Sequence, residues 1–310
     1  MIETIKQNVN LHLAQFVDKA KREYKLDEIN PYLYKCIKDF CLRDGKRIRP
    51  ILLILSYKGY SPKTKRVSSS LYSASTSIEM LHNFMLIHDD IIDKSDLRRG
   101  KPTMHKMLGK IIKTDSPDTL GCDLAIVAGD LIYALAIDSF LSIKEESSRK
   151  QKALKYFTQT VTFTAMGEFI DTLDGLKQVK DIKEKDVLLN YSLKTARYTF
   201  ENPLVIGAIL AGADNKEIKK LEKIGLLIGQ AFQIQDDIIG MFDTEKNIGK
   251  SLLSDLSELK KTMLVCHAYE NLSAPQRKKF LNIFNKEKKS LEDLEDVKEI
   301  FLNAGSLEYC

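Results

Sequence analysis

Apolar residues recur at intervals of three and four along most of the chain, as in the series Leu71, Ala74, Ile78, Leu81 and Met85. This spacing places apolar side chains on one face of an α-helix. A sustained two-residue alternation with hairpin turns, which would predict a sheet, does not occur. The predicted helices cover approximately residues 2–24, 31–43, 48–59, 65–94, 118–142, 148–173, 184–200, 203–212, 215–241, 255–270, 275–284 and 291–303.

Prolines help to place the helix starts. Asn30-Pro31, Ser61-Pro62 and Ser116-Pro117 each combine a residue that can cap a helix with a proline that suits the first helical position. Long stretches without proline favour uninterrupted helices between these points. Because no low-complexity linker divides the chain, we expect one all-α domain over residues 1–310.

Composition and charge narrow the class of protein. The chain has 310 residues, of which 44% are apolar and 29% charged, with a net charge of +5. This charge is too small to indicate nucleic acid or an anionic membrane surface as a partner, so any anion site is local. The five cysteines form no C-x-x-C pair, which favours reduced thiols in a cytoplasmic protein. The N-terminus lacks a signal-peptide pattern, and the apolar runs fall short of the roughly 20 residues that a membrane span needs.

The most informative segment is an apolar helical run that ends in aspartates. Asp89, Asp90 and Asp93 follow the pattern D-D-x-x-D. Asp89 and Asp93 are four residues apart, so on a helix they share a face, where their carboxylates repel one another. A hard cation reverses that repulsion, and Mg²⁺ is commonly held by one or two carboxylates together with substrate phosphate oxygens. The motif predicts a Mg²⁺-dependent phosphate site, and a solvated acidic helix end is the alternative.

Cationic residues flank this motif. Lys46, Arg47 and Arg49 lie at a predicted helix start, where backbone N–H groups and the helix dipole already favour an anion. Arg98 and Arg99 follow the last aspartate by five and six residues. Lysine offers a point charge and arginine a bidentate fork for phosphate. Both groups predict phosphate binding, although each also fits a solvated turn or plain salt bridges.

A second pair, Asp236-Asp237, again ends an apolar helical run. Gln233 precedes Asp236 by three residues and therefore shares its helix face. Further cations follow, among them Lys250. Packing alone does not explain two separate aspartate pairs that are each followed by cations. The pattern predicts one cavity in which opposing helices hold a metal-bridged diphosphate.

At this point the sequence resembles the polyprenyl synthetase family of trans-prenyl diphosphate synthases, over roughly residues 40 to 265. The resemblance is closest to archaeal-type short-chain geranylgeranyl and farnesyl diphosphate synthases. It implies a single-domain bundle of long helices around a central cavity. The segments that carry it are Gly45 to Pro50, Glu79 to Asp93 with Arg98-Arg99-Gly100, Lys194-Thr195, Gln233 to Asp237, and Gly249-Lys250 with Asp255.

The resemblance assigns roles to individual positions. Asp89 and Asp93 would be the main ligands of two Mg²⁺ ions, with Asp90 in support. Asp236 would bind a third ion, with Asp237 nearby. The residues that would hold the allylic diphosphate are Arg98, Lys194, Thr195, Gln233 and Lys250. The residues that would hold isopentenyl diphosphate are Lys46, Arg49, His82 and Arg99.

Two positions depart from the family pattern. Gly240 stands where the second motif would carry its third acidic residue, and Asp243, three residues further on, is only a partial substitute. We therefore expect a single metal ion at Asp236 rather than a complete second carboxylate triad. Glu168, between Gly167 and Asp171, stands where the family pattern G-Q-x-x-D has glutamine.

The implied reaction begins with ionisation of the allylic diphosphate, because metal ions and cations stabilise charge on the leaving group. The double bond of isopentenyl diphosphate then attacks the allyl cation, and a proton is lost, with the released diphosphate as a plausible base. Phe84, with Met85 and Leu81 as neighbours, would form a floor that limits the length of the product. The expected product is geranylgeranyl diphosphate (C20), with farnesyl diphosphate (C15) or a longer product as alternatives.

Two other functions compete with this interpretation. A class I terpene cyclase would need no isopentenyl diphosphate site, so the presence of Lys46 and Arg49 argues against it. A non-catalytic subunit of a heteromeric synthase would be expected to lose its aspartate or arginine clusters, and this chain keeps both. The resemblance also implies a homodimer.

Overall fold

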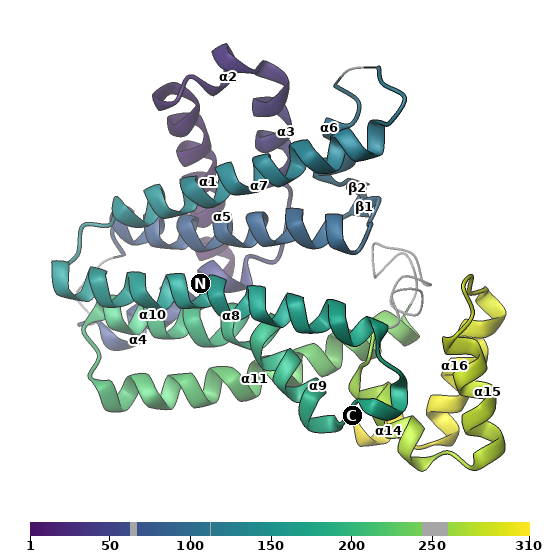
Figure 1. Ribbon diagram of the computed structural model, residues 1–310. Helices are drawn as coiled ribbons and strands as arrows, with labels where there is room; N and C mark the ends of the chain where they lie inside the picture. The colour runs from purple at the N-terminus through teal and green to yellow at the C-terminus, as the bar shows by residue number, and fades with distance from the viewer. Residues whose placement is uncertain (63–66, 112, 244–259) are drawn as a thin grey trace. The chain divides into compact units, whose positions relative to one another are not determined.

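The computed structural model describes residues 1–62, 67–111, 113–243 and 260–310. Over these residues the chain is almost entirely helical, which confirms the all-α prediction (Figure 1). Its internal contacts divide it into two compact units. Unit 1 comprises Met1–Gln159 with Thr199–Lys223, and unit 2 comprises Thr160–Tyr198 with Ile224–Cys310. The single domain over residues 1–310 stays a prediction.

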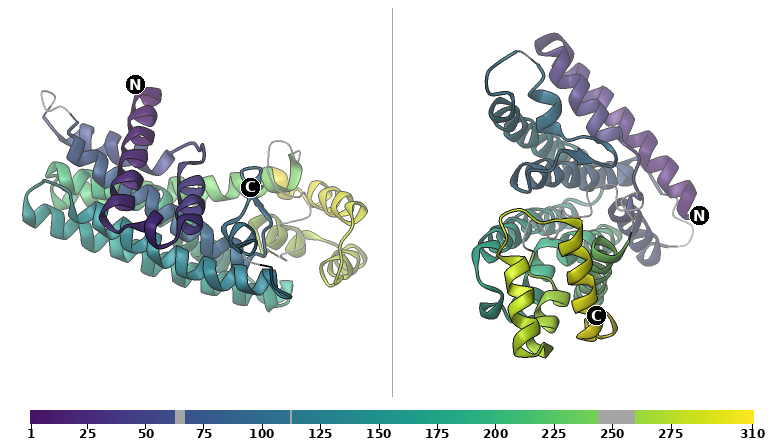
Figure 2. Two further views of the ribbon diagram at one scale, coloured as in Figure 1. Left: turned by 90° about the horizontal axis from the view of Figure 1, so that it is seen from above. Right: turned by 90° about the vertical axis from the view of Figure 1, so that its right-hand side faces the viewer.

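Unit 1 is built around two long helices, α5 (Ser69–Ile92) and α7 (Pro117–Leu141), which pack along one another (Figure 1). Helix α4 (Ile48–Tyr60) packs against α10 (Asn202–Ala211), and α1 (Ile2–Glu23) lies across α5 (Figure 2). The remaining elements of this unit are α2 (Leu26–Ile29), α3 (Pro31–Leu42), α6 (Met104–Leu108) and the first parts of α8 (Ser147–Leu176) and α11 (Asn215–Phe242).

The apolar series on α5 forms part of the core of unit 1. Leu71, Ala74, Ile78 and Leu81 are all buried, as their helical spacing predicts, and only Met85 is partly exposed. The helix begins at Ser69, where the Ser68 side chain accepts a hydrogen bond from the Leu71 N–H over 3.2 Å.

The proline signals had mixed outcomes. Ser61-Pro62 is not a helix start, because Ser61 ends α4. The predicted cap at Asn30 is confirmed by a hydrogen bond of 2.9 Å from the Leu33 N–H to Asn30 Oδ1. Pro117 occupies the first turn of α7, but Ser116 makes no side-chain cap.

A short hairpin follows α5. Strands β1 (Leu97–Arg98) and β2 (Lys101–Pro102) pair in antiparallel register. The two residues between them, Arg99 and Gly100, have φ values of 56° and 71°. Positive φ at both central residues is typical of the tight turn that joins two strands with a right-handed twist. The chain therefore reverses after α5, and Arg98 is brought back toward the end of that helix.

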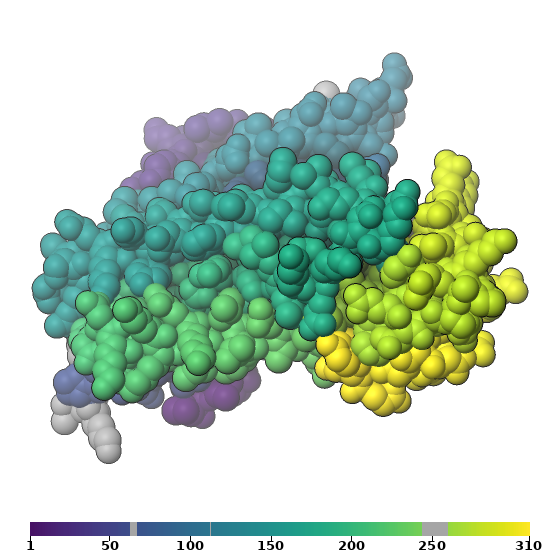
Figure 3. Space-filling view, turned by 60° about the horizontal axis from the view of Figure 1, so that its bottom comes forward, coloured from purple at the N-terminus to yellow at the C-terminus, as the bar shows by residue number. Residues whose placement is uncertain are grey.

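Unit 2 holds the C-terminal part of the chain. Its elements after α8 are the short η1 (Val179–Asp181), α9 (Glu184–Asn190), most of the π-helix η2 (Tyr191–Glu201), the later part of α11, α14 (Met263–Asn271), α15 (Ala274–Phe284), α16 (Leu291–Asn303) and α17 (Ser306–Tyr309). Its apolar core includes Leu264, Phe280, Val297 and Phe301. Figure 3 shows the outer surface of the C-terminal helices in yellow-green and yellow. Of the helix predicted over 255–270, residues 255–259 lie outside the described residues, residues 260–262 are not helical, and α14 begins at Met263.

Helix α7 is unusually apolar. Within the described residues it is the one helix whose length and composition alone would allow it to cross a membrane. Of its 18 most apolar consecutive residues, 39% are buried inside the protein. Core helices of soluble proteins meet the same criteria, and α7 packs along α5 and α6.

Candidate active site

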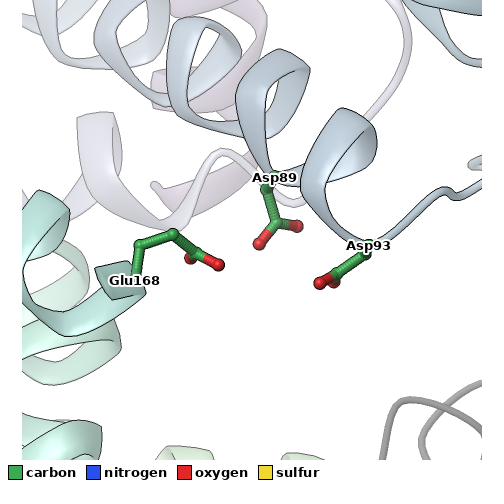
Figure 4. A group of neighbouring side chains, drawn as sticks. All are labelled: Asp89, Asp93 and Glu168. Atoms are coloured by element: carbon green, nitrogen blue, oxygen red, sulfur yellow. The ribbon is translucent and has the colours of Figure 1, made fainter. Parts of the chain in front are cut away.

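The first aspartate motif lies at the C-terminal end of α5. Figure 4 shows the side chains of Asp89 and Asp93 on successive turns of this helix. The Asp93 N–H donates to the Asp89 carbonyl oxygen over 2.8 Å and closes the last turn of the helix. Asp90 is fully buried, whereas Asp89 and Asp93 are partly exposed. Asp89 and Asp93 therefore share a face, as their spacing predicts, and Asp90 lies on the core side.

Arg98 joins these aspartates from the hairpin. Its Nε donates to Asp90 Oδ1 over 2.6 Å, and its Nη2 donates to Asp89 Oδ2 over 3.0 Å. Burial raises the pKa of Asp90 to about 7, although the charge of Arg98 opposes that rise. Asp90 Oδ2 is buried and has no hydrogen-bond partner. Asp90 thus holds Arg98 against the motif, and Asp89 and Asp93 are the carboxylates that a ligand can reach.

Arg49 and His82 lie in contact within unit 1. Arg49 Nη1 is 3.2 Å from His82 Nε2, and Arg49 Nη2 donates to Thr199 Oγ1 over 2.7 Å. Burial, followed by the charge of Arg49 and other arginines, lowers the pKa of His82 well below its ordinary value. The imidazole is therefore neutral, and its Nε2 accepts a hydrogen bond from Arg49.

Positive charge is concentrated around this imidazole. Burial lowers the pKa of Arg99, and neighbouring arginines lower it further. Arg99 Nη1 also donates to the Arg43 carbonyl oxygen over 3.4 Å. Lys46, three residues after Arg43, is exposed. Like charges held together cost free energy that a bound anion relieves. The arginines whose charges lower the pKa of His82 are Arg47, Arg49, Arg98 and Arg99.

Arg47 has a structural role that the sequence does not reveal. Its Nη1 donates to Glu79 Oε1 over 2.5 Å, its Nε to Asn10 Oδ1 over 2.8 Å, and its Nη2 to the Arg43 carbonyl oxygen over 2.6 Å. Arg47 is 4% exposed and Glu79 is 2% exposed. Buried charges need such partners. This ion pair ties the basic turn before α4 to α5, and Asn10 ties it to α1.

Lys194, in unit 2, lies between two carboxylates of α8. Its Nζ is 2.7 Å from Asp171 Oδ2 and 2.9 Å from Glu168 Oε2. Glu168 and Asp171 are three residues apart on the helix, so both face the lysine. Glu168, at the position where the resemblance leads us to expect glutamine, therefore gives Lys194 a second negative partner.

The segment that carries Lys194 and Thr195 is π-helical: the helix predicted over 184–200 is an α-helix over Glu184–Asn190 and continues as a π-helix over Tyr191–Glu201. Two glycines allow neighbouring helices to approach this segment closely. A Cβ atom at Gly167 would lie 2.4 Å from the Lys194 nitrogen, and a Cβ atom at Gly229 would lie 2.4 Å from Ala196 Cα. Only glycine permits contacts this close. π-Helical turns are rare and often occur at functional sites.

A hydrogen-bonded network connects this segment to the second aspartate motif. Thr195 Oγ1 donates to Gln233 Oε1 over 2.7 Å, and Gln233 Nε2 donates to Asp237 Oδ1 over 2.8 Å. The Tyr191 hydroxyl donates to Asp237 Oδ2, and it accepts the Met263 N–H over 2.9 Å. The structure thus brings together three of the predicted residues, Thr195, Gln233 and Asp237. Tyr191 belongs to no motif and could not be found from the sequence.

The two aspartates of the second motif differ in their surroundings. Asp236 is exposed, whereas Asp237 is partly buried. Asp243 lies one residue beyond the end of α11, where its N–H donates to the Ile239 carbonyl oxygen over 2.9 Å. Asp236 is therefore the more accessible carboxylate for a ligand. Lys250, which the sequence assigns to the allylic diphosphate, lies outside the described residues, as do Gly249 and Asp255.

The residues predicted to limit product length lie on α5. Phe84 is partly buried, and its ring stacks on that of Tyr133 in α7, with centroids 5.0 Å apart. The ring of His88 meets the edge of Phe84 with centroids 4.7 Å apart. Leu81 is buried in the core and Met85 is partly exposed. Tyr133 is a second aromatic at this position that no sequence motif indicated.

Comparison with known proteins places this geometry in a family context. The sequence model of the family described as Polyprenyl synthetase matches residues 30–301. The short chain isoprenyl diphosphate synthase of Methanocaldococcus jannaschii is 30% identical over 307 residues, which cover 99% of this chain and 84% of that protein. The geranylgeranyl diphosphate synthase of Sulfolobus acidocaldarius is 34% identical over 281 residues, which cover 90% of this chain and 79% of that protein.

Solved structures that resemble this chain are also prenyl diphosphate synthases. The geranylgeranyl pyrophosphate synthase of Corynebacterium glutamicum, complexed with isoprenyl diphosphate and magnesium, aligns with a TM-score of 0.89 and 26% identity over 100% of this chain and 88% of that one. The geranylgeranyl pyrophosphate synthetase of Pyrococcus horikoshii aligns with a TM-score of 0.81 and 27% identity over 99% and 85% of the two chains.

Proposed function

Because the chain belongs to the polyprenyl synthetase family, we propose that it condenses isopentenyl diphosphate with allylic diphosphates and that its main product is geranylgeranyl diphosphate. The chain is a prenyltransferase, so the resemblance seen in its sequence is confirmed. The observation that carries the proposed chemistry is the pair of accessible carboxylates, Asp89 and Asp93, with the Arg98 guanidinium hydrogen-bonded to Asp89.

The acidic residues fit Mg²⁺. Asp89 and Asp93 offer hard oxygen ligands one helical turn apart, while Asp90 is committed to Arg98. We propose that Asp89 and Asp93 bind two ions and that the exposed Asp236 binds a third, with Asp237 in support. When bound, Mg²⁺ would supply positive charge to the diphosphate leaving group.

The cationic residues divide into two proposed groups. Lys46, Arg49, His82 and Arg99 would bind isopentenyl diphosphate, and the crowded positive charge around His82 supports this assignment. The second group would bind the allylic diphosphate and comprises Arg98, Lys194, Thr195, Gln233 and Lys250. The charged donors in this group would stabilise the negative charge that develops on the leaving group as the allylic C–O bond breaks.

The proposed C20 product rests on Phe84. Its stacking on Tyr133 makes a rigid aromatic pair five residues before Asp89, where a growing hydrocarbon chain would end. Leu81 and Met85 would complete this floor. A product of C15, or one longer than C20, is the competing outcome.

Incubation of the purified protein with Mg²⁺, isopentenyl diphosphate and C5, C10 or C15 allylic diphosphates tests the proposal. We expect a C20 diphosphate as the main product, identified by mass spectrometry. A C15 or C25 main product would correct the chain length only. Cyclic hydrocarbons without consumption of isopentenyl diphosphate would contradict the whole proposal and favour a terpene cyclase.

We also propose a cytoplasmic homodimer. Only 39% of the 18 most apolar consecutive residues of α7 are buried within one chain, and the side chains of Ile126 and Val127 are 44% and 62% exposed. A second copy that covers this face would remove the apolar surface from water. All five cysteines are free, as a reducing compartment would require. Light scattering should give twice the mass of one chain, and a monomer would contradict the dimer.

A further inference from the structure

Tyr191 stands at one end of the hydrogen-bonded network in unit 2, although it belongs to none of the segments that carry the family resemblance. It is 6% exposed and packs with Ile182, Val187 and Met263 in an apolar cluster. A buried hydroxyl group needs partners, and this one has two. It accepts the Met263 N–H and donates to Asp237 Oδ2.

The direction of every hydrogen bond in the network follows from the chemistry of its groups. An ionised carboxylate only accepts, so Asp237 requires a donor at each oxygen. The Met263 N–H only donates, so the Tyr191 hydroxyl must direct its own proton to Asp237. At the other oxygen of Asp237, Gln233 must present its NH₂ group. The carbonyl oxygen of Gln233 is then left to accept the Thr195 hydroxyl proton.

The network therefore has one consistent arrangement, and each member fixes the next. Its far end, Thr195, neighbours Lys194, and Asp237 neighbours Asp236.

We propose that Tyr191 is a positioning residue for the allylic diphosphate, whose hydroxyl group fixes Asp237 and, through it, the amide of Gln233 and the hydroxyl of Thr195. The proposal rests on the assignment of Thr195 and Gln233 to that substrate. Asp237 acts as the acceptor at the centre of the network, and its neighbour Asp236 presents the exposed carboxylate.

The test is the substitution Tyr191→Phe, which removes the hydroxyl group and keeps the buried ring. We expect kcat/KM for the allylic diphosphate to fall about tenfold, the size typical of a lost hydrogen bond to a charged group. The KM for isopentenyl diphosphate should stay within about twofold of the wild-type value, because its proposed ligands lie outside the network.

Tyr309→Phe is the matched control, because Tyr309 also donates its hydroxyl proton to a carboxylate in unit 2, that of Glu184 over 2.9 Å. It should leave kcat/KM for the allylic diphosphate and KM for isopentenyl diphosphate unchanged.

Asp237→Asn supplies a second probe, since an amide side chain has one acceptor oxygen where the carboxylate offers one to each of the two donors. If Tyr191 acts through Asp237, the double variant should have a kcat/KM for the allylic diphosphate less than twofold below that of Asp237→Asn alone, a difference near the limit of what the measurement can resolve.

The outcomes separate the possibilities. Wild-type kinetic constants in Tyr191→Phe would overturn the proposal. A substrate affinity that is weakened equally for the allylic diphosphate and for isopentenyl diphosphate would also overturn it, because that result would indicate a purely structural role. Effects of Tyr191→Phe and Asp237→Asn that multiply would overturn the route through Asp237. Failure of the wild-type protein itself to consume isopentenyl diphosphate would instead contradict the proposed function.

Discussion

Phe84 on α5 stacks on Tyr133 of α7, with ring centroids 5.0 Å apart and ring planes inclined by 28°. The two residues belong to helices that pack along one another, so the contact joins the aspartate-bearing helix to its neighbour. His88, one turn further along α5, also contacts the Phe84 ring in an edge-to-face arrangement. Phe84 therefore has one aromatic partner on its own helix and one on α7.

This arrangement predicts how product length responds to truncation. Phe84→Ala should shift the main product beyond C20, because it removes the ring proposed to stop the hydrocarbon chain. Tyr133→Ala should give a smaller shift, since Phe84 stays in place but loses its support. The double variant should give the longest products. Mass spectrometry of the extracted diphosphates measures the distribution.

Tyr133→Phe is the control for this series. It keeps the ring and removes only the hydroxyl group, so the product should remain C20. An unchanged product distribution in Phe84→Ala would remove Phe84 as the floor. An unchanged distribution in Tyr133→Ala, with a clear shift in Phe84→Ala, would limit the floor to the α5 residue.

The buried pair of Arg47 and Glu79 predicts a large effect on stability. Glu79→Ala leaves the guanidinium charge of Arg47 buried without its carboxylate, which typically costs about 3–5 kcal/mol. Urea unfolding followed by circular dichroism measures this loss. Asp44→Ala is the control, because Asp44 pairs with Lys6 but its side chain is 85% exposed. That surface pair is expected to contribute less than about 1 kcal/mol. A loss below that value for Glu79→Ala would show that Arg47 finds another partner.

His82 predicts a dependence of stability on pH. Its pKa in the folded protein is well below that in the unfolded chain, so the unfolded chain binds a proton first as pH falls. The free energy of unfolding should therefore decrease as pH drops below about 6.5, the ordinary histidine value. The variant His82→Gln lacks this titration, and its free energy of unfolding should fall less steeply between pH 7 and pH 5. Parallel curves for the two proteins would show that His82 is not titrating in this way.

The sequence predicted what depends on local spacing. The shared face of Asp89 and Asp93 follows from the helical period, and the burial of Leu71 and Ile78 follows from the same rule. The end of α5 was predicted within two residues, but the hairpin that returns Arg98 to the motif was not. That reversal depends on positive φ at Arg99 and Gly100, and arginine gives no signal for such a conformation.

The missed features depend on contacts between distant parts of the chain. Arg47 and Glu79 are 32 residues apart, and Tyr191 and Asp237 are 46 apart. No local pattern specifies such partners. The π-helix was missed because its residues have ordinary helical spacing. The close approaches at Gly167 and Gly229 appear only when α8 and α11 are packed against it.

The two aspartate motifs make the sharpest prediction for activity. Asp89→Ala and Asp236→Ala should each lower kcat by about 10²–10³-fold, the effect expected when a group that stabilises developing charge is removed. Both carboxylates are at least partly accessible, so the fold should be kept, as circular dichroism can verify. If Asp236 binds a metal ion, Asp236→Ala should also need more Mg²⁺ to reach half of its own maximal rate.

Asp118→Asn is the control for these variants, because Asp118 is 77% exposed and pairs with Lys106 on the surface. It should keep the wild-type rate and the wild-type Mg²⁺ requirement, since it changes one acidic charge far from either motif in the sequence. Near-wild-type turnover in Asp89→Ala would contradict the first metal site, and in Asp236→Ala the second. A loss of turnover in Asp236→Ala with an unchanged Mg²⁺ dependence would assign Asp236 to the substrate rather than to a metal ion.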